Sequence, residues 1–153
     1  MSTTPALTDF DKQIRAFVYD LTMKEGLVPS VQQIVSALGK FRQEVAASLK
    51  SLAEAHMLVL QAETGEILMA NPFSAVPTPF LVQAGGVTYF GNCIWDALGI
   101  PAMLHQDAVI QASCPDCGMA MTLHIVKGEL QPTEGIVHFV LPTRQWWDNI
   151  VFT

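Results

Sequence analysis

Three prolines stand within residues 71–79, and they divide the chain into two parts with different patterns. Before them, apolar residues recur at helical spacing, whereas after them short runs have the composition of strands. Proline favours an extended backbone and interrupts both helices and sheets. We therefore expect an α+β protein with an N-terminal module over residues 1–70, a connector over 71–86 and a small mainly β domain over 87–153.

The pattern of the N-terminal module predicts three helices followed by a β-hairpin. The first helix ends at Gly26, and the second is capped by Ser30 together with Gln33 and ends at Gly39. Two short apolar runs then flank a turn at residues 63–66. This order of elements is typical of a winged-helix-like fold. The apolar residues that carry the pattern are Phe10, Ile14, Phe17, Val18 and Leu21 in the first helix, Val31, Ile34, Val35 and Leu38 in the second, Phe41, Val45, Leu49 and Leu52 in the third, and Met57–Leu60 and Ile67–Ala70 in the hairpin.

A winged helix invites a DNA-binding interpretation, and Lys40, Arg42 and Lys50 lie in or near the helix that would enter a groove. Residues 1–70 nevertheless contain six Lys and Arg against eight Asp and Glu. A module with a negative balance of charge is repelled by the phosphate backbone. We therefore expect a structural or interaction role for this module, with nucleic acid an unfavoured partner.

The C-terminal part of the sequence predicts four strands and a short helix. The helix follows Cys93 and should pack into the sheet. The strands are rich in β-branched and aromatic residues or alternate in hydropathy. Their expected ranges are Val87–Phe90, Val109–Ala112, Met119–Ile125 and Ile136–Leu141.

The composition of the chain indicates where the protein is located and which kinds of partner it has. Half of its 153 residues are hydrophobic and 14% are charged, against about 25% in typical soluble domains. Such a chain buries more surface than usual or shields some through a partner, so we expect self-association as a homodimer. No apolar stretch approaches the roughly 20 residues of a membrane helix, and the N-terminus lacks a signal-peptide pattern. We therefore expect a soluble cytoplasmic protein without membrane contact and, at a net charge of −6, without nucleic acid.

Cys93 and Asp96 stand three residues apart in an apolar segment, so a helix would bring them to one face. A thiolate binds soft metals, and a carboxyl group can deliver a proton. The helix N-terminus should lower the pKa of the Cys93 thiol, whereas apolar neighbours should raise the pKa of the Asp96 carboxyl. The alternative from spacing alone is a buried cysteine that acts as a small hydrophobe beside a helix-capping aspartate.

Cys114 and Cys117 form a CxxC motif that is followed by Gly118. In a reducing compartment such a pair indicates metal or redox chemistry more readily than a disulfide framework. Cys114 and Cys117 are therefore candidate metal ligands, with zinc as one candidate ion, although a structural zinc normally takes four ligands. The alternatives are a pair that only stabilises the turn, a metal site shared with a histidine or Cys93, and a redox pair.

The remaining histidines and tryptophans are weaker candidates. His124 is expected on the exposed face of a strand, and nothing in the sequence marks His56 or His138 as ligands. Trp146 and Trp147 could shield a pocket for an organic group. Adjacent tryptophans in so apolar a chain more often belong to a core.

The run Tyr89–Ala102, the connector Asn71–Pro79 and the later Val140–Pro142 resemble sequences of the alkylmercury (organomercurial) lyase family. The resemblance covers most of the chain and is most distinctive around Cys93. It implies protonolysis of a carbon–mercury bond, which yields a hydrocarbon and Hg(II) held by protein thiolates. It implies no organic cofactor, because mercury enters with the substrate and leaves as the product ion. External thiols or a mercuric reductase would remove that product.

Residue by residue, the resemblance implies that Cys93 binds mercury and that Asp96 delivers the proton and helps to hold the metal. It also implies a second catalytic cysteine just after a segment like Trp146–Thr153, and the sequence ends at that point. Either a downstream segment carries this thiol, or this lineage lacks it. We expect an organomercurial lyase-like enzyme, and the alternative is a non-catalytic thiol-based metal-binding or metal-sensing winged-helix protein.

Overall fold

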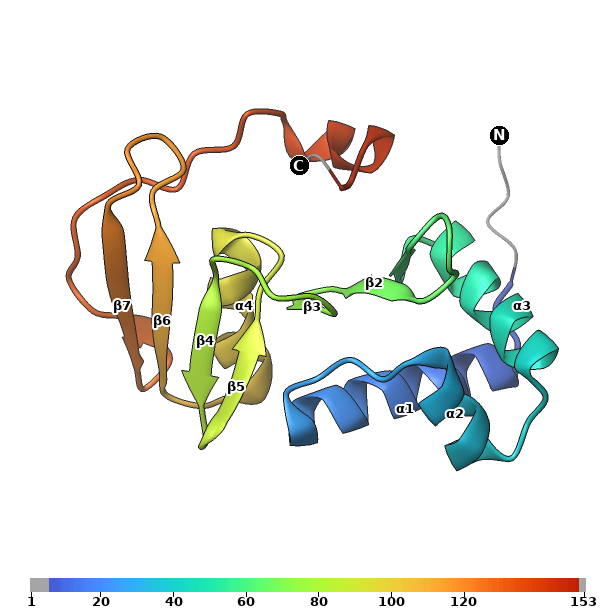
Figure 1. Ribbon diagram of the computed structural model, residues 1–153. Helices are drawn as coiled ribbons and strands as arrows, with labels where there is room; N and C mark the ends of the chain where they lie inside the picture. Colours follow the sequence, from blue (N-terminus) through green and yellow to red (C-terminus); the bar gives the residue numbers. More distant parts are fainter. Residues whose placement is uncertain (1–5, 152–153) are drawn as a thin grey trace.

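The computed structural model describes residues 6–151 and shows an α+β protein. Its elements in chain order are α1 (Asp9–Glu25), α2 (Val31–Leu38), α3 (Arg42–Glu54), β1 (Val59–Leu60), β2 (Ile67–Ala70), β3 (Phe73–Ser74), β4 (Leu81–Ala84), β5 (Val87–Phe90), α4 (Ile94–Leu104), β6 (Ala108–Ser113), β7 (Ala120–Val126), β8 (Glu129–Leu130) and the 3-10 helix η1 (Thr143–Asp148). Helices α1–α3 gather at one end, the larger sheet forms the other, and β2 and β3 run between them (Figure 1). Within the described residues, none of the helices has the length and apolar character needed to cross a bilayer.

Local sequence signals set the bounds of the first two helices. Ser30 caps α2 through a reciprocal pair of hydrogen bonds with Gln33, and Thr8 caps α1 in the same way. Gly26 and Gly39 end the two helices in the left-handed conformation, which glycine adopts without steric cost. The predicted capping box and both predicted helix ends are confirmed.

The apolar faces of α1–α3 enclose one hydrophobic core together with the β1–β2 hairpin. Phe41 does not contribute to it, although its position in the pattern predicted an inward side chain. It is 79% exposed because it precedes α3 as the N-cap residue and so lies off the buried face of that helix. The buried residues of this core are Ile14, Val18, Val31, Ile34, Val45, Leu49, Leu52, Leu58, Ile67 and Ala70.

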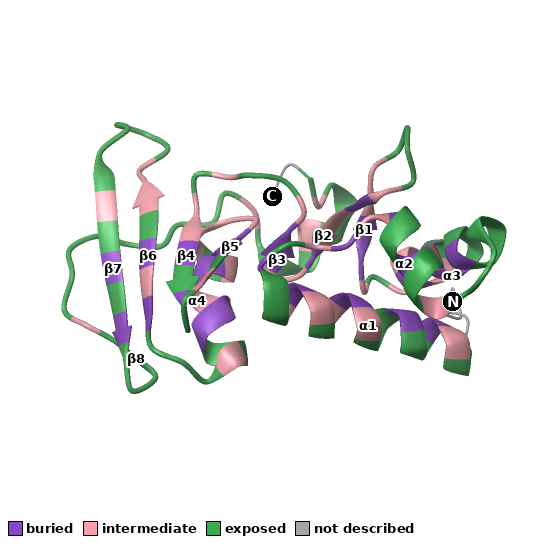
Figure 2. Ribbon diagram, turned by 60° about the horizontal axis from the view of Figure 1, so that its bottom comes forward, coloured by how far each residue is buried: buried purple, intermediate pink, exposed green. Residues whose placement is uncertain are grey.

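The larger sheet has five antiparallel strands in the order β5-β4-β6-β7-β8. Strands β5, β6 and β7 agree with three of the predicted strands to within one residue at each end. Strand β4 was not predicted, because it lies inside the stretch expected to be a connector. It is nevertheless a central strand, with Val82 paired to Tyr89 on one side and Ile110 on the other. Figure 2 shows the alternation of buried and exposed residues along β7 and the exposure of the chain beyond β8.

Residues 136–141 form no strand, so the predicted strand Ile136–Leu141 is wrong. Ile136 is 96% exposed, and the segment leaves the sheet after β8 instead of pairing with it. Phe139 packs against Trp95 of α4 and Trp146 of η1. β-branched and aromatic residues favour a strand only where a neighbouring strand completes the packing, and here α4 and η1 supply those contacts.

The C-terminal end of α1 joins the helical half to the larger sheet. The Tyr89 hydroxyl of β5 donates a hydrogen bond to the Met23 carbonyl at 2.6 Å. Gly26 lies so close to β5 that a Cβ atom there would stand 2.2 Å from the Thr88 carbonyl oxygen. Glycine is therefore required at this position for spacing as well as for conformation.

Candidate active site

The turn between β5 and α4 presents Asn92 and Cys93 at the N-terminus of α4. Gly91 makes this turn, and its carbonyl accepts a hydrogen bond from Thr78 Oγ1 at 2.6 Å. A Cβ atom on Gly91 would lie 2.7 Å from the backbone nitrogen of Ala97, too close for a normal contact. The close approach of β5 to α4 thus depends on glycine, and it fixes where the following residues lie.

Cys93 is the N-cap residue of α4, and its side chain is half-buried. Burial raises the pKa of the thiol and the negative charge of Asp96 adds to that effect, whereas the backbone N–H groups of Asp96 and Trp95 oppose it. The prediction of a lowered pKa at Cys93 is therefore wrong. The N–H groups act in the expected direction, but the loss of water around the sulfur outweighs them.

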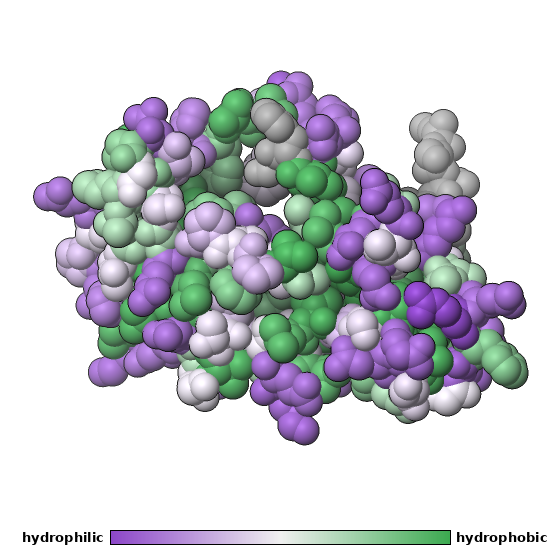
Figure 3. All heavy atoms as spheres, in the orientation of Figure 1, coloured by the Kyte–Doolittle hydropathy of each residue, from purple (hydrophilic) through white to green (hydrophobic). Residues whose placement is uncertain are grey.

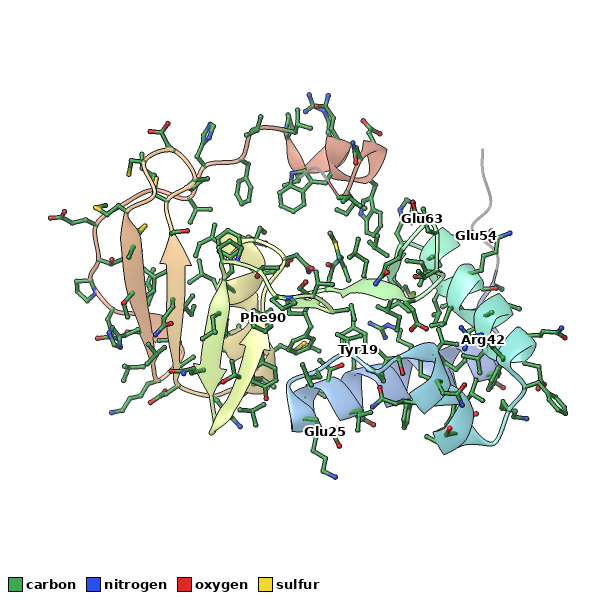
Figure 4. All side chains as sticks on the ribbon, in the orientation of Figure 1. Tyr19, Glu25, Arg42, Glu54, Glu63 and Phe90 are labelled. Carbon is green, nitrogen blue, oxygen red and sulfur yellow. The ribbon has the colours of Figure 1, made fainter. Side chains whose placement is uncertain are left out.

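Asp96 lies in the first turn of α4 and is connected through Asn92 to a chain of hydrogen bonds that reaches the helical half of the molecule. Asn92 Nδ2 donates to Asp96 Oδ2 at 2.9 Å and to Asn71 Oδ1 at 3.0 Å. The Tyr19 hydroxyl donates to the Asn71 carbonyl at 2.8 Å. Figure 4 shows Tyr19 pointing from α1 toward β3. The orientation of the carboxyl is thereby linked to the helical half.

Burial raises the pKa of the Asp96 carboxyl, and hydrogen bonds from the side chain and backbone of Asn92 reduce this effect without cancelling it. The predicted direction for Asp96 is confirmed. The negative charge of Asp96 also acts on Tyr19. The pKa of the Tyr19 hydroxyl is raised first by burial and further by this charge. The Asp96 carboxyl is therefore partly removed from water and lies close enough to Tyr19 for its charge to act there.

A pocket of about 130 Å³ opens beside Cys93. A cavity of roughly 150 Å³ can hold a benzene ring, so this pocket suits one small organic group next to the sulfur. Asp96 is not part of the pocket wall. The lining residues come from the start of α4 and from the segment that follows β8: Cys93, Ile94, His138, Phe139, Val140, Leu141 and Trp146.

Aromatic contacts hold the C-terminal segment over Cys93. The Phe139 ring lies 5.8 Å from the Trp95 ring and 5.1 Å from the Trp146 ring, measured between centroids. Trp146 Nε1 donates to the Leu141 carbonyl at 3.1 Å. Figure 3 shows hydrophobic side chains gathered where this segment approaches the rest of the molecule. Trp146 lines the pocket and is only half-buried, which agrees with the interpretation that it shields a pocket and not with the expectation of a core residue.

His138 lines the same pocket as Cys93, although nothing in the sequence marked it. A thiol and an imidazole are both side chains that bind soft and borderline metals. The sequence signal was missing because residues around His138 were expected in a strand, and nothing in the pattern placed them beside Cys93. Two of the other three histidines differ: His124 is exposed on β7, as predicted, and His56 stacks against Trp147.

Cys114 and Cys117 lie in the turn between β6 and β7, and neither lines the Cys93 pocket. Within residues 6–151, no group of three or more His, Cys, Asp or Glu side chains is placed to hold a metal ion. The structure therefore does not gather the three cysteines at one site. It brings Cys93 and Asp96 together, as predicted, and leaves the CxxC pair apart from them.

A family model described as "MerB: Alkylmercury lyase" matches residues 73–153, which is more than half of the chain. The chain belongs to the alkylmercury lyase family. The resemblance seen in the sequence is thereby confirmed, and the matched range includes α4 with Cys93 and Asp96 as well as the whole pocket-lining segment.

The fold of this alkylmercury lyase family member is similar to that in the structure described as "Crystal structure of the mercury-bound form of MerB2". The two share 23% sequence identity and superpose with a TM-score of 0.63. The match covers 82% of this chain and 60% of the other, so the present chain spans less than two thirds of that protein. None of the curated protein sequences compared with the chain matches it.

Proposed function

We propose that this alkylmercury lyase family member cleaves the carbon–mercury bond of small organomercurials by protonolysis, with Cys93 binding mercury and Asp96 supplying the proton. The observation that supports this most is the Asp96 carboxyl, which has a raised pKa and lies in the same helical turn as a thiol that opens into an apolar pocket. A raised pKa keeps a carboxyl protonated to a higher pH than an ordinary aspartate, which suits a general acid.

In the proposed reaction, the Cys93 sulfur bonds to the mercury of R–Hg–X, and X leaves with the thiol proton. Electron density from sulfur makes the carbon on mercury a better proton acceptor. Asp96 then gives its proton to that carbon, and the electron pair of the carbon–mercury bond forms the new carbon–hydrogen bond. Hg(II) stays on the Cys93 thiolate, and the ionised Asp96 helps to hold it.

Asn92 is placed to support Asp96 in both protonation states. Its Nδ2 donates to Asp96 Oδ2 at 2.9 Å, and an ionised carboxylate accepts such a bond. Its Oδ1 is buried and has no hydrogen-bond partner within the described part of the chain. A half-turn of the amide would present Oδ1 to a protonated Asp96, which can donate one hydrogen bond. Asn92 is in this proposal a positioning residue.

We assign the winged-helix-like module over residues 1–70 a structural part in this function. Tyr19 of α1 reaches the Asn71 carbonyl, and Asn71 in turn contacts Asn92 beside the acid. The reaction as written needs no organic cofactor, only external thiols or a mercuric reductase to take up Hg(II). We propose that it takes place in the cytoplasm, and that a homodimer covers part of the apolar surface.

The test is benzene release from phenylmercury in excess thiol, for the wild-type chain and its Cys93→Ser and Asp96→Asn variants. Asp20→Asn is the matched control, because Asp20 is an exposed carboxylate of α1. Release that both site variants abolish and the control retains is the expected result. Release that survives Cys93→Ser would overturn the proposal, and mercury binding without release would favour a thiol-based metal-binding protein.

A further inference from the structure

The turn between β6 and β7 holds Cys114 and Cys117 in a fixed arrangement. The Cys114 backbone N–H donates to the Met119 carbonyl at 2.9 Å, and the Gly118 N–H donates to the Cys114 carbonyl at 2.8 Å. Gly118 has a φ of 71°, the left-handed conformation that closes such a turn. All of these bonds are made by backbone atoms, so neither cysteine side chain is needed to close the turn.

The two thiols belong to the same turn and stand three residues apart in the chain. The Cys117 side chain and the backbone of Cys117 and Asp116 lie close enough to the Cys114 sulfur to interact with it. Cys117 is exposed and Cys114 is half-buried, so both sulfurs can be reached from solution.

The described surroundings of the pair supply Cys114 and Cys117 as its two candidate ligands. Within residues 6–151, no third His, Cys, Asp or Glu joins them in a group that could hold a metal. Structural zinc takes four ligands, so this turn alone does not make a zinc site. Two thiolates suit a soft ion that accepts two-coordinate binding, and Hg(II) is such an ion.

We propose that Cys114 and Cys117 form a surface two-thiolate site that captures Hg(II), separate from the pocket at Cys93. The exchange balances as Hg(SR)₂ plus two protein thiols giving one protein-bound S–Hg–S unit and two RSH molecules. Two S–Hg bonds form, two break, and each departing thiolate carries away one thiol proton. No oxidant or reductant is required.

That the captured Hg(II) is the product of this chain's own lyase reaction rests on the proposed function. In that case Hg(II) displaced from Cys93 by external thiols reaches the turn as a thiol complex. The site itself does not depend on catalysis, because neither Cys114 nor Cys117 lines the Cys93 pocket. Its failure and the failure of the lyase reaction can therefore be told apart.

The experiment is a titration of the reduced full chain with HgCl₂ in excess glutathione, read by native mass spectrometry. Cys93→Ser is the background, since it leaves Cys114 and Cys117 as the chain's cysteines. We expect one Hg(II) per monomer, with a mass gain that shows the loss of two protons. A second thiol in the same turn has an effective concentration of millimolar or more, so Cys114→Ser or Cys117→Ser in that background should weaken binding at least about tenfold.

Equal affinity in the Cys93→Ser chain and in its Cys114→Ser and Cys117→Ser derivatives would overturn the proposal. So would mercury that appears only as a bridge between two chains. Serine at either position keeps the backbone bonds of the turn, and far-UV circular dichroism verifies that each variant is folded. Benzene release by the wild-type chain is measured beside the titration, and its absence would contradict the lyase function while leaving the two-thiolate site standing.

Discussion

Trp147 stacks on His56 with the ring centroids 4.2 Å apart and the two planes 5° from parallel. His56 follows α3 in the helical half, whereas Trp147 lies in η1, directly after the pocket residue Trp146. The stacking contact therefore connects the C-terminal segment that lines the Cys93 pocket to the helical half of the molecule. Phe139 makes a second contact of this wall, with Trp95 of α4.

His56→Ala should loosen this wall and expose Cys93. An aromatic pair contributes about 0.5–1.5 kcal/mol, which corresponds to a roughly two- to tenfold change in the open population. The measurement is the rate of Cys93 alkylation by iodoacetamide in a chain that also carries Cys114→Ser and Cys117→Ser. We expect a rate increase of this size. His56→Phe retains a stacking ring and should retain the wild-type rate, and an unchanged rate in His56→Ala would contradict the fastening role.

Asn92→Leu should shift the pH dependence of the reaction. The Asn92 hydrogen bonds stabilise the ionised Asp96 and so lower its pKa, and losing the side-chain bond raises that pKa further above its ordinary value. A general acid is active below its pKa, so activity falls as the pH rises through it. The alkaline limb of kcat/KM for phenylmercury is therefore expected at higher pH in Asn92→Leu.

Tyr19→Phe is the matched control for this shift. It removes the hydrogen bond to Asn71 but leaves the contact between Asn92 and Asp96 in place. The alkaline limb of the kcat/KM profile should shift less in Tyr19→Phe than in Asn92→Leu. A larger shift in Tyr19→Phe, or none in Asn92→Leu, would argue against Asp96 as the acid whose pKa Asn92 controls.

The helical half was predictable because its signals are local. A capping serine, its partner three residues on and a terminal glycine act within one turn of chain, so Ser30, Gln33 and Gly39 suffice to place α2. Strand β4 lacked such signals: four residues that follow closely on Pro79 gain their pairing from β5 and β6. Strand pairing depends on residues that are distant in the chain, so the sequence of a short segment near prolines does not predict it.

Those features of the site that depend on residues close together in the sequence were predictable. Cys93 and Asp96 share a helical turn by spacing alone, and the apolar character of that segment indicated the direction in which burial moves the pKa of Asp96. The pKa of Cys93 depends instead on how far water is excluded around the sulfur, which distant residues decide. Among these are His138 and Phe139, whose place over α4 follows from ring packing and not from any periodic pattern.

Gly91→Ala should destabilise the fold and disturb the site. The added Cβ would meet the Ala97 backbone at 2.7 Å, where no flexible side chain can yield. Overpacking of this kind costs about 1–3 kcal/mol. Gly99→Ala is the control, because a Cβ there would meet only Pro72 at 3.7 Å, and alanine in a helix is favoured over glycine by up to ~1 kcal/mol. Urea denaturation measures both, and equal stability of the two variants would contradict the close-approach argument.

Phe139→Leu should reduce the preference of the pocket for aryl groups. Phe139 packs edge-on against Trp95 and tilted against Trp146, and it lines the pocket that we propose receives the organic group on mercury. Leucine fills much of the volume but loses the aromatic contact, which contributes about 0.5–1.5 kcal/mol. The expected result is a KM for phenylmercury that rises roughly two- to tenfold, with little change for methylmercury.

Val140→Ala separates this aromatic effect from a general loss of packing. Val140 lines the same pocket with an aliphatic side chain, and trimming it removes apolar surface that either substrate can contact. Its effect on phenylmercury and methylmercury should therefore be similar. A Phe139→Leu variant that raises both KM values equally would show that the ring only shapes the wall, whereas a selective rise for phenylmercury places the aryl group against Phe139 and Trp146.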